Sequence, residues 1–261
     1  RGRGHNDLQG NGSPHDQRIK EPLMAKRPLP SFIAMWQRHE ELYCGIFRAA
    51  LQELSNKKLT GNENNISLTL YPTLNEVCFQ LGKSKNIEVP SPNPERPIFP
   101  VIENELDDES IGKRPDFTCN RLNPFAESPE EHEIPLHVEC KLLGQPKPSS
   151  PSWKFNEKYV TNGIKRFDSK SHEYGKRASS GLMIGYIISM EPKTILDEVN
   201  HCQKKELPDN PCIKFTFENS RTFQSYQGLK RKTVKPSDFN LIHIWADLRW
   251  GYDKKGVPVK S

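Results

Sequence analysis

Three residues near the middle of this 261-residue chain, Asp116, Glu139 and Lys141, have the types that hydrolysis of a phosphodiester bond requires. Two carboxylates can hold Mg²⁺ through oxygen ligands and leave coordination positions open for water and a phosphate oxygen. A nearby lysine ammonium can orient that water, lower its pKa and offset the charge that develops in the transition state. Together these residue types indicate metal-dependent hydrolysis.

The spacing places the three residues on two neighbouring strands. Segments 114–120 and 134–143 both have the pattern of a β-strand, and a polar loop separates them. Successive side chains of a strand point to opposite faces, so Glu139 and Lys141 share one face, about 7 Å apart, while the other face is apolar. An antiparallel pairing of the two segments brings Asp116 beside them.

Two further residues of the second segment lie close to this group. The backbone carbonyl of Cys140, between Glu139 and Lys141, is a further candidate metal ligand. His137 shares the face of Glu139 and could assist the reaction, although a lone histidine on a strand is more often structural. The alternative for the whole group is a solvated strand face that carries an incidental ion pair.

The acid-x-Lys triplet alone is not specific, because it occurs four times in this chain. Only the triplet at 139–141 lies inside a strand-like segment with apolar residues at alternate positions and follows a Pro-Asp pair, Pro115-Asp116. A central proline disfavours the triplet at 191–193 as a strand. The triplets at 168–170 and 253–255 lie in polar stretches. Context therefore selects the first triplet.

Pro115-Asp116, followed after 22 residues by Glu139-Cys140-Lys141, resembles the signature of the PD-(D/E)xK nuclease superfamily. The resemblance implies a restriction-endonuclease-like α/β core with a mixed central sheet flanked by helices. It also implies that Asp116 and Glu139 bind Mg²⁺, for which Mn²⁺ can substitute, and that Lys141 assists the attack of water. The implied activity is endonucleolytic, with double-stranded DNA as the expected substrate and restriction or mobile-element defence as a setting.

Members of this superfamily often add a glutamate from an N-terminal helix as a further metal ligand. Glu76 is our candidate, since it lies near the start of an expected helix and close in sequence to the strand pair. Glu40 and Glu41, in an earlier helix, are also candidates. A solvated helix carboxylate is an equally good explanation of Glu76.

Basic residues after the strand pair are candidates for contact with the nucleic-acid backbone, although such residues are usually solvated surface. From Arg221 to Ser261 there are nine Lys or Arg against three Asp. Trp245 and Trp250 are candidates for base stacking, but core packing suits Trp245 better. The predicted nucleic-acid-binding residues are Lys165, Arg166, Lys230, Arg231 and Lys232.

The order of elements predicts the α/β class with one domain over residues 31–261, preceded by a loosely packed or disordered arm at 1–30. Loops are expected at 61–65 and at 88–113, the second with a short strand near 98–102. The expected helices are 32–54, 73–83, 153–167 and 192–202, with a short extended stretch just before residue 73. The further expected strands are 180–190, 212–218 and 239–248.

Composition narrows the class of protein. The net charge of +5 is compatible with a polyanionic partner, and no apolar run is long enough for a membrane span or a signal peptide. Six scattered cysteines have neither zinc-site spacing nor a disulfide pattern. We therefore expect a soluble cytoplasmic protein with reduced thiols and no membrane partner.

Two other functions remain open on the sequence. The chain could be a nuclease fold without turnover that binds nucleic acid or scaffolds other proteins, or it could be a ribonuclease, since none of these residues distinguishes the sugar. A homodimer also remains open, because many members of the superfamily dimerise to cut both strands.

Overall fold

The computed structural model describes residues 31–146, 150–217 and 220–259. The chain divides into two units, Arg1–Ser31 and Phe32–Ser261. The expected arm at 1–30 lies outside the described residues. All helices and strands below belong to the second unit.

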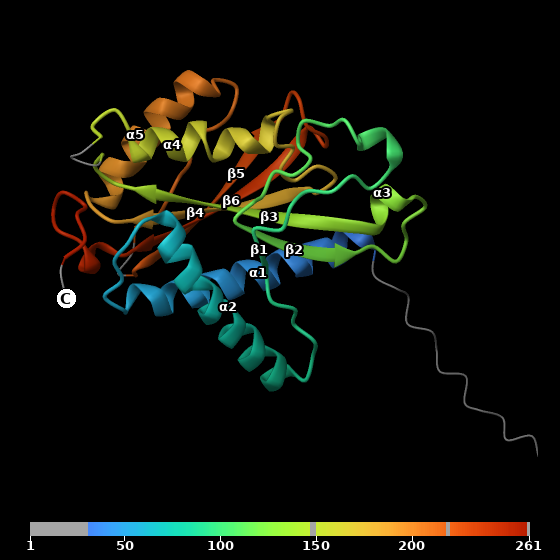
Figure 1. Cartoon of the computed structure of the whole chain (residues 1–261), viewed down its shortest axis with the longest axis horizontal. Helices are drawn as coiled ribbons and strands as arrows, with labels where there is room; N and C mark the ends of the chain where they lie inside the picture. Colours follow the sequence, from blue (N-terminus) through green and yellow to red (C-terminus); the bar gives the residue numbers. More distant parts are fainter. Residues whose placement is uncertain (1–30, 147–149, 218–219, 260–261) are drawn as a thin grey trace, which may run out of the picture. The chain divides into compact units, whose positions relative to one another are not determined.

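One mixed sheet organises the described part of this unit (Figure 1). Its six strands follow the order β1-β2-β3-β4-β6-β5. The β1-β2, β2-β3 and β5-β6 pairs are antiparallel, and the β3-β4 and β4-β6 pairs are parallel. The strands are β1 (Asn93–Pro94), β2 (Phe117–Leu122), β3 (Glu133–Leu143), β4 (Ser180–Ile187), β5 (Thr222–Lys230) and β6 (Asp238–Asp247).

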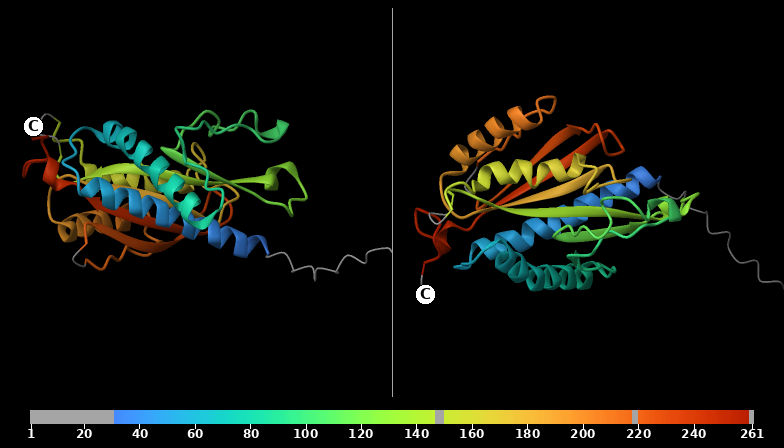
Figure 2. Two further views of the ribbon diagram at one scale, coloured as in Figure 1. Left: turned by 90° about the horizontal axis from the view of Figure 1, so that it is seen from below. Right: turned by 45° about the horizontal axis from the view of Figure 1, so that its top comes forward.

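Helices cover both faces of the sheet, as expected for the α/β class (Figures 1 and 2). One face packs against α1 (Phe32–Ser55) and α2 (Glu63–Lys85), and the other against α4 (Phe155–Thr161) and α5 (Pro192–Glu206). The remaining elements are short: α3 (Pro129–His132) and the 3₁₀ helices η1 (Glu103–Glu105), η2 (Ile164–Asp168) and η3 (Arg249–Gly251).

The apolar cores on the two faces explain why β3 and β4 lie inside the sheet. Every residue of β4 is buried, as a strand covered on both faces requires. Along β3, Val138 and Cys140 belong to the core under α1 and α2, whereas Leu143 belongs to the core under α4 and α5. The polar residues Glu139 and Lys141 are nevertheless buried too.

Several sequence-based predictions are confirmed. The first helix begins and ends within a residue of its expected bounds, and β2 and β3 form the expected antiparallel pair. Strands β4 and β6 and helix α5 also lie where their apolar patterns place them. The predicted helix at 153–167 is instead α4 followed, after two residues, by η2.

The predicted loop at 61–65 and the extended stretch before residue 73 are wrong. Helix α2 begins at Glu63 and continues through Pro72. Asn62 caps the helix by accepting a hydrogen bond from the N–H of Asn65 at 2.9 Å. Pro72 removes one backbone donor from the helix. Packing of Ile66, Leu70 and Leu74 against the sheet stabilises the helix on both sides of Pro72.

Two strand predictions are also wrong. Segment 98–102 contains no strand, and neither does the described part, 212–217, of the strand predicted at 212–218, whose last residue lies outside the described residues. The sequence pattern also does not predict β5. The inward-facing residues of β5 include Ser225 and Gln227, which are buried but polar. A half-buried strand with polar residues at its inward positions lacks the alternation of apolar residues from which a strand is predicted in a sequence.

Candidate active site

The candidate site lies where β3 continues beyond the start of β2. Strand β2 begins with Phe117, which pairs with Val138, so the next part of β3 has no strand partner on that side. Carboxylates take its place. The N–H of Cys140 donates to Asp116 Oδ2 at 2.6 Å, and the N–H of Leu142 donates to Glu63 Oε2 at 3.1 Å. The edge of β3 thus holds two carboxylates beside Glu139.

Lys141 joins the carboxylates of this cluster. Its Nζ lies 2.6 Å from Glu139 Oε1 and 3.0 Å from Glu63 Oε1, and it donates to the carbonyl of Cys140 at 2.6 Å. Burial disfavours the ammonium, but the charges of Glu139, Glu63 and Asp116 outweigh this effect and raise the pKa of Lys141. The ammonium is therefore held charged at the centre of three oxygen ligands.

Glu139 is the innermost member, with a side chain only 1% exposed. Burial, followed by the charge of Asp116, raises the pKa of the Glu139 carboxyl to about 8. Oε1 pairs with Lys141 and Arg166, while Oε2 is buried without a hydrogen-bond partner among the described residues. Burial likewise raises the pKa of Asp116. Crowded, desolvated carboxylates of this kind are the groups that a cation stabilises.

Arg166 closes the solvent side of the cluster. It comes from η2, its guanidinium pairs with Glu139, and it lies 5.9 Å from the ring centroid of Tyr174. The side chains of Arg166 and Glu63 are 27% and 30% exposed, so both reach the surface. The cluster therefore extends from a buried carboxylate to a partly exposed cationic group that could contact a phosphate.

The structure brings together Asp116, Glu139, Lys141 and the carbonyl of Cys140, as predicted from the sequence, and adds Glu63. The sequence pattern does not point to Glu63, because the Asn-rich segment 61–65 is typical of a loop. A usable signal is nevertheless present, since Asn62 followed by an acidic residue is typical of a capped helix start.

Glu76 is not part of this cluster. It is exposed on α2, and its carboxylate accepts a hydrogen bond from Gln80 at 2.6 Å, one turn further along the helix. Because α2 begins at Glu63, the helix reaches the cluster through its first residue, and Glu76 lies more than three turns away. Glu40 and Glu41 lie on α1, and neither has an ion pair or hydrogen bond with the described residues of the cluster.

Arg231 also differs from its predicted role as a nucleic-acid contact. Its side chain is buried against the ring of Phe239, and it donates hydrogen bonds to the carbonyls of Phe167, Tyr174 and Gly175. Burial lowers its pKa to about 10. A run of basic residues is typical of a surface, but this member of the run holds the loop after η2 against β5.

The other predicted contacts remain open to solvent. Lys165 pairs with Glu206 at 2.8 Å, Lys230 pairs with Asp238, and Lys232 pairs with Asp209 at 2.5 Å. Lys230 and Lys232 are exposed. Trp245 is fully buried in the core, as expected, and Trp250 is 58% exposed.

The donor set is suited to a hard divalent cation. Within the described residues, no three His, Cys, Asp or Glu side chains are already arranged around one point as metal ligands. The oxygens that surround the Lys141 ammonium nevertheless come from Glu139, Glu63 and Cys140, with Asp116 alongside. Together with the unpartnered Oε2 of Glu139, they supply the oxygen chemistry that Mg²⁺ and Mn²⁺ accept.

Comparison with protein-family models, curated proteins and solved structures finds no significant match. In the described part of the chain, no helix combines the length and apolar character that a membrane span needs.

Proposed function

We propose that this protein is a Mg²⁺-dependent endonuclease whose active site is formed by Glu63, Asp116, Glu139 and Lys141. The observation that carries the proposal is the meeting of three carboxylates and a lysine where β3 continues beyond the start of β2. Glu139 is fully buried, and its Oε2 has no hydrogen-bond partner among the described residues, a destabilising feature that function would explain.

In this proposal, the metal would be held by Asp116, Glu139 and the Cys140 carbonyl. When bound, it would supply Lewis-acid stabilisation of a phosphate oxygen and a nucleophilic water at neutral pH. Glu63 anchors the edge of β3 through the N–H of Leu142 and holds the Lys141 ammonium. Lys141 orients the water and offsets developing negative charge, and Arg166 contacts the phosphate at the rim.

The finer fold assignment and the substrate belong to the same proposal. The restriction-endonuclease-like core is supported by the mixed sheet and by the position of the cluster at the β2-β3 pair. DNA is the proposed substrate, from the resemblance of the motif. The exposed residues Lys230 and Lys232 remain proposed contacts with the sugar-phosphate backbone of the nucleic acid. Arg231 does not.

The direct test is incubation of the purified protein with supercoiled plasmid in Mg²⁺, with and without EDTA, and in parallel with a structured RNA. We expect nicked or linear plasmid in Mg²⁺ and intact plasmid in EDTA. Lys141→Met protein, purified by the same procedure, controls for a contaminating nuclease. Cleavage that persists at full rate in EDTA, or in that variant, would contradict the proposal, and cleavage of RNA alone would change the substrate.

Glu63 provides a smaller, more specific prediction. Glu63→Gln keeps the hydrogen bond to the Leu142 N–H but weakens the hold on Lys141, so we expect plasmid cleavage to slow by about 10- to 100-fold. Glu76→Gln, on the same helix, is the matched control and should cleave at the parental rate. Initial rates at saturating Mg²⁺ measure the difference. Equal rates for the two variants would remove Glu63 from the site.

A further inference from the structure

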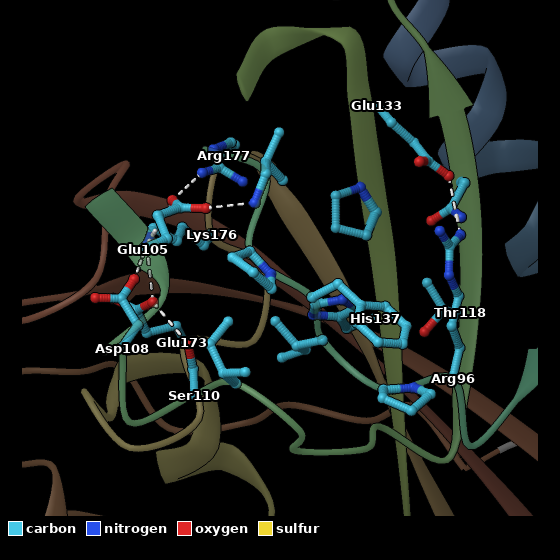
Figure 3. A pocket seen from close by; sticks show the side chains of 18 residues that line it. Arg96, Glu105, Asp108, Ser110, Thr118, Glu133, His137, Glu173, Lys176 and Arg177 are labelled. Carbon is cyan, nitrogen blue, oxygen red and sulfur yellow. Dashed lines mark hydrogen bonds and ion pairs between the residues drawn. The ribbon is translucent and has the colours of Figure 1, made fainter. Parts of the chain in front are cut away.

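A cavity of about 300 Å³ lies against the β2-β3 pair (Figure 3). Thr118 and His137, which pair across β2 and β3, line it. Thr118 is two residues after Asp116, and His137 is two residues before Glu139. The strand rise therefore places these two residues about 7 Å from the cluster, on the same face of the sheet. Neither residue has a role in the proposed hydrolysis.

Thr118 carries an unused hydrogen-bonding group. Its side chain is 3% exposed, and its Oγ1 has no hydrogen-bond partner among the described residues. A buried hydroxyl without a partner reduces stability, so its presence calls for an explanation. A ligand that hydrogen-bonds to Thr118 provides one.

His137 supplies a second group beside Thr118. Its Nδ1 accepts a hydrogen bond from the N–H of Gly175 at 3.0 Å, which places the proton on Nε2 as a donor. Because Nδ1 accepts this hydrogen bond, it carries no proton, and the ring is neutral. Asn120, two residues after Thr118 on β2, also lines the cavity. This end of the cavity thus offers neutral donors and acceptors.

The charged residues of the cavity compensate one another. Arg96 pairs with Glu133 at 2.9 Å on one side of His137 (Figure 3). On the other side, Lys176 and Arg177 pair with acidic residues, namely Glu105, Asp108 and Glu173. Three cations against four carboxylates leave a lining charge of −1. The cavity is therefore unsuited to a phosphate or another anion.

The walls of the cavity are apolar and rigid, so they favour ligands whose shape fits the cavity. They are formed by Pro97, Ile98, Pro100, Ile111 and Pro135. Proline fixes its backbone dihedral φ, so such a wall changes little when a ligand binds. The volume lies at the lower end of the usual range for ligand sites, about 300 to 1,000 Å³, and suits a single ring system.

We propose that this cavity binds a neutral heterocycle of nucleobase size, which hydrogen-bonds to Thr118 and His137 and packs against the proline-rich wall. The choice of a nucleobase among neutral heterocycles rests on the proposed nuclease function. The source is a free nucleoside or a base turned out of a nucleic-acid strand, since both offer the same hydrogen-bonding edge. In the second case, the cavity selects the base beside the bond that is cut.

The test is a calorimetric titration of the full chain in EDTA, where hydrolysis does not occur. The probes are thymidine, deoxyadenosine, deoxycytidine and deoxyguanosine, each also presented within a short single-stranded oligonucleotide. We expect saturable binding of at least one base, and about tenfold weaker binding by Thr118→Val protein because one hydrogen bond is lost. Thr233→Val, at an exposed position, should bind like the parent.

The Thr118→Val protein should also unfold at the parental temperature or above it, since the change removes an unpartnered buried hydroxyl. Ile111→Phe adds a ring to the wall and should block binding independently. Binding of free nucleosides alone indicates a small-molecule ligand, and tighter binding of the oligonucleotide indicates a base within a strand. Either result supports the site.

No binding of any probe at millimolar concentration, or equal binding by parent and Thr118→Val proteins, would overturn the site. These outcomes are separate from those for the nuclease. Mg²⁺-dependent cleavage without base binding removes only the cavity proposal, and base binding without cleavage removes only the nuclease proposal.

Discussion

Lys141→Met protein is expected to cleave plasmid at least about a hundredfold more slowly than the parent and yet to bind Mn²⁺ about tenfold more tightly. The loss of rate follows from the removal of a charge that stabilises the transition state, which typically contributes 10²- to 10³-fold. The gain in affinity follows from the contacts of the ammonium. Lys141 Nζ is bonded to Glu139, Glu63 and the Cys140 carbonyl, which are oxygens that a divalent cation would also use.

These opposite changes distinguish a catalytic lysine from a structural one. Without the ammonium, Glu63, Asp116 and Glu139 repel one another, and this repulsion favours an added cation. Calorimetric titration with Mn²⁺ measures the affinity, and initial cleavage rates at saturating metal measure the chemistry. A structural lysine would lower the unfolding temperature and weaken both properties together.

Lys170→Met is the matched control for this variant. Lys170 belongs to the acid-x-Lys triplet at 168–170, and it is exposed just after the end of η2. We expect its rate and its Mn²⁺ affinity to equal those of the parent. If Lys170→Met slows cleavage as much as Lys141→Met, or if Lys141→Met binds Mn²⁺ more weakly, the assignment of Lys141 is wrong.

The centre of the site is predictable from the sequence because local patterns determine it. Alternation along 134–143 places Glu139 and Lys141 on one face, and the short polar loop makes pairing with the preceding strand the simplest arrangement. Both inferences need only neighbouring residues. The structure adds one fact that alternation does not carry, namely that both side chains are buried rather than solvated.

Glu63 and Arg231 show where local patterns fail. Glu63 reaches the cluster only because α2 continues through Pro72, and the packing of α2 against the sheet outweighs the local cost of that proline. Arg231 lies in a basic run that is typical of a surface, but carbonyls from the distant loop after η2 surround its guanidinium. Both outcomes depend on contacts between segments far apart in the chain.

A second large effect is expected on acidification. The imidazoles of His39, His137 and His243 are buried, and burial lowers their pKa values to about 4, 3 and 3. In the unfolded chain each would take up a proton near pH 6.5. Below that pH the unfolded state binds more protons than the folded state, so the free energy of unfolding falls as the pH falls.

The size of this effect follows from the number of protons. Each buried imidazole contributes about 1.4 kcal/mol for every pH unit below 6.5, or about 2 kcal/mol at pH 5. Glu139 acts in the opposite sense, because its pKa is raised to about 8 in the folded protein. Its stabilising contribution grows as the pH falls from about 8 and is complete below the unfolded pKa near 4.5. For these four groups, three imidazoles against one carboxyl leave an uptake of about two protons on unfolding between pH 6 and pH 4.5. His172, whose pKa burial lowers to about 4, adds to this uptake.

His243 is the position at which this uptake is best tested. Its ring is fully buried and lies 2.8 Å from the hydroxyl of Tyr159 and 3.0 Å from the side-chain oxygen of Gln227, and burial disfavours the charged form of the ring. His243→Gln removes one titrating group, so the slope of unfolding free energy against pH should fall by about 1.4 kcal/mol per unit between pH 6 and pH 4.5. Urea unfolding in EDTA at several pH values measures both slopes. His201→Gln, at an exposed position of α5, is the control and should keep the parental slope.

His243→Gln protein is expected to be less stable than the parent at pH 7, because the hydrogen bonds of the ring are lost, and to approach or exceed the stability of the parent in acid. Parallel curves for the parent and His243→Gln would show that His243 is not held neutral by the core.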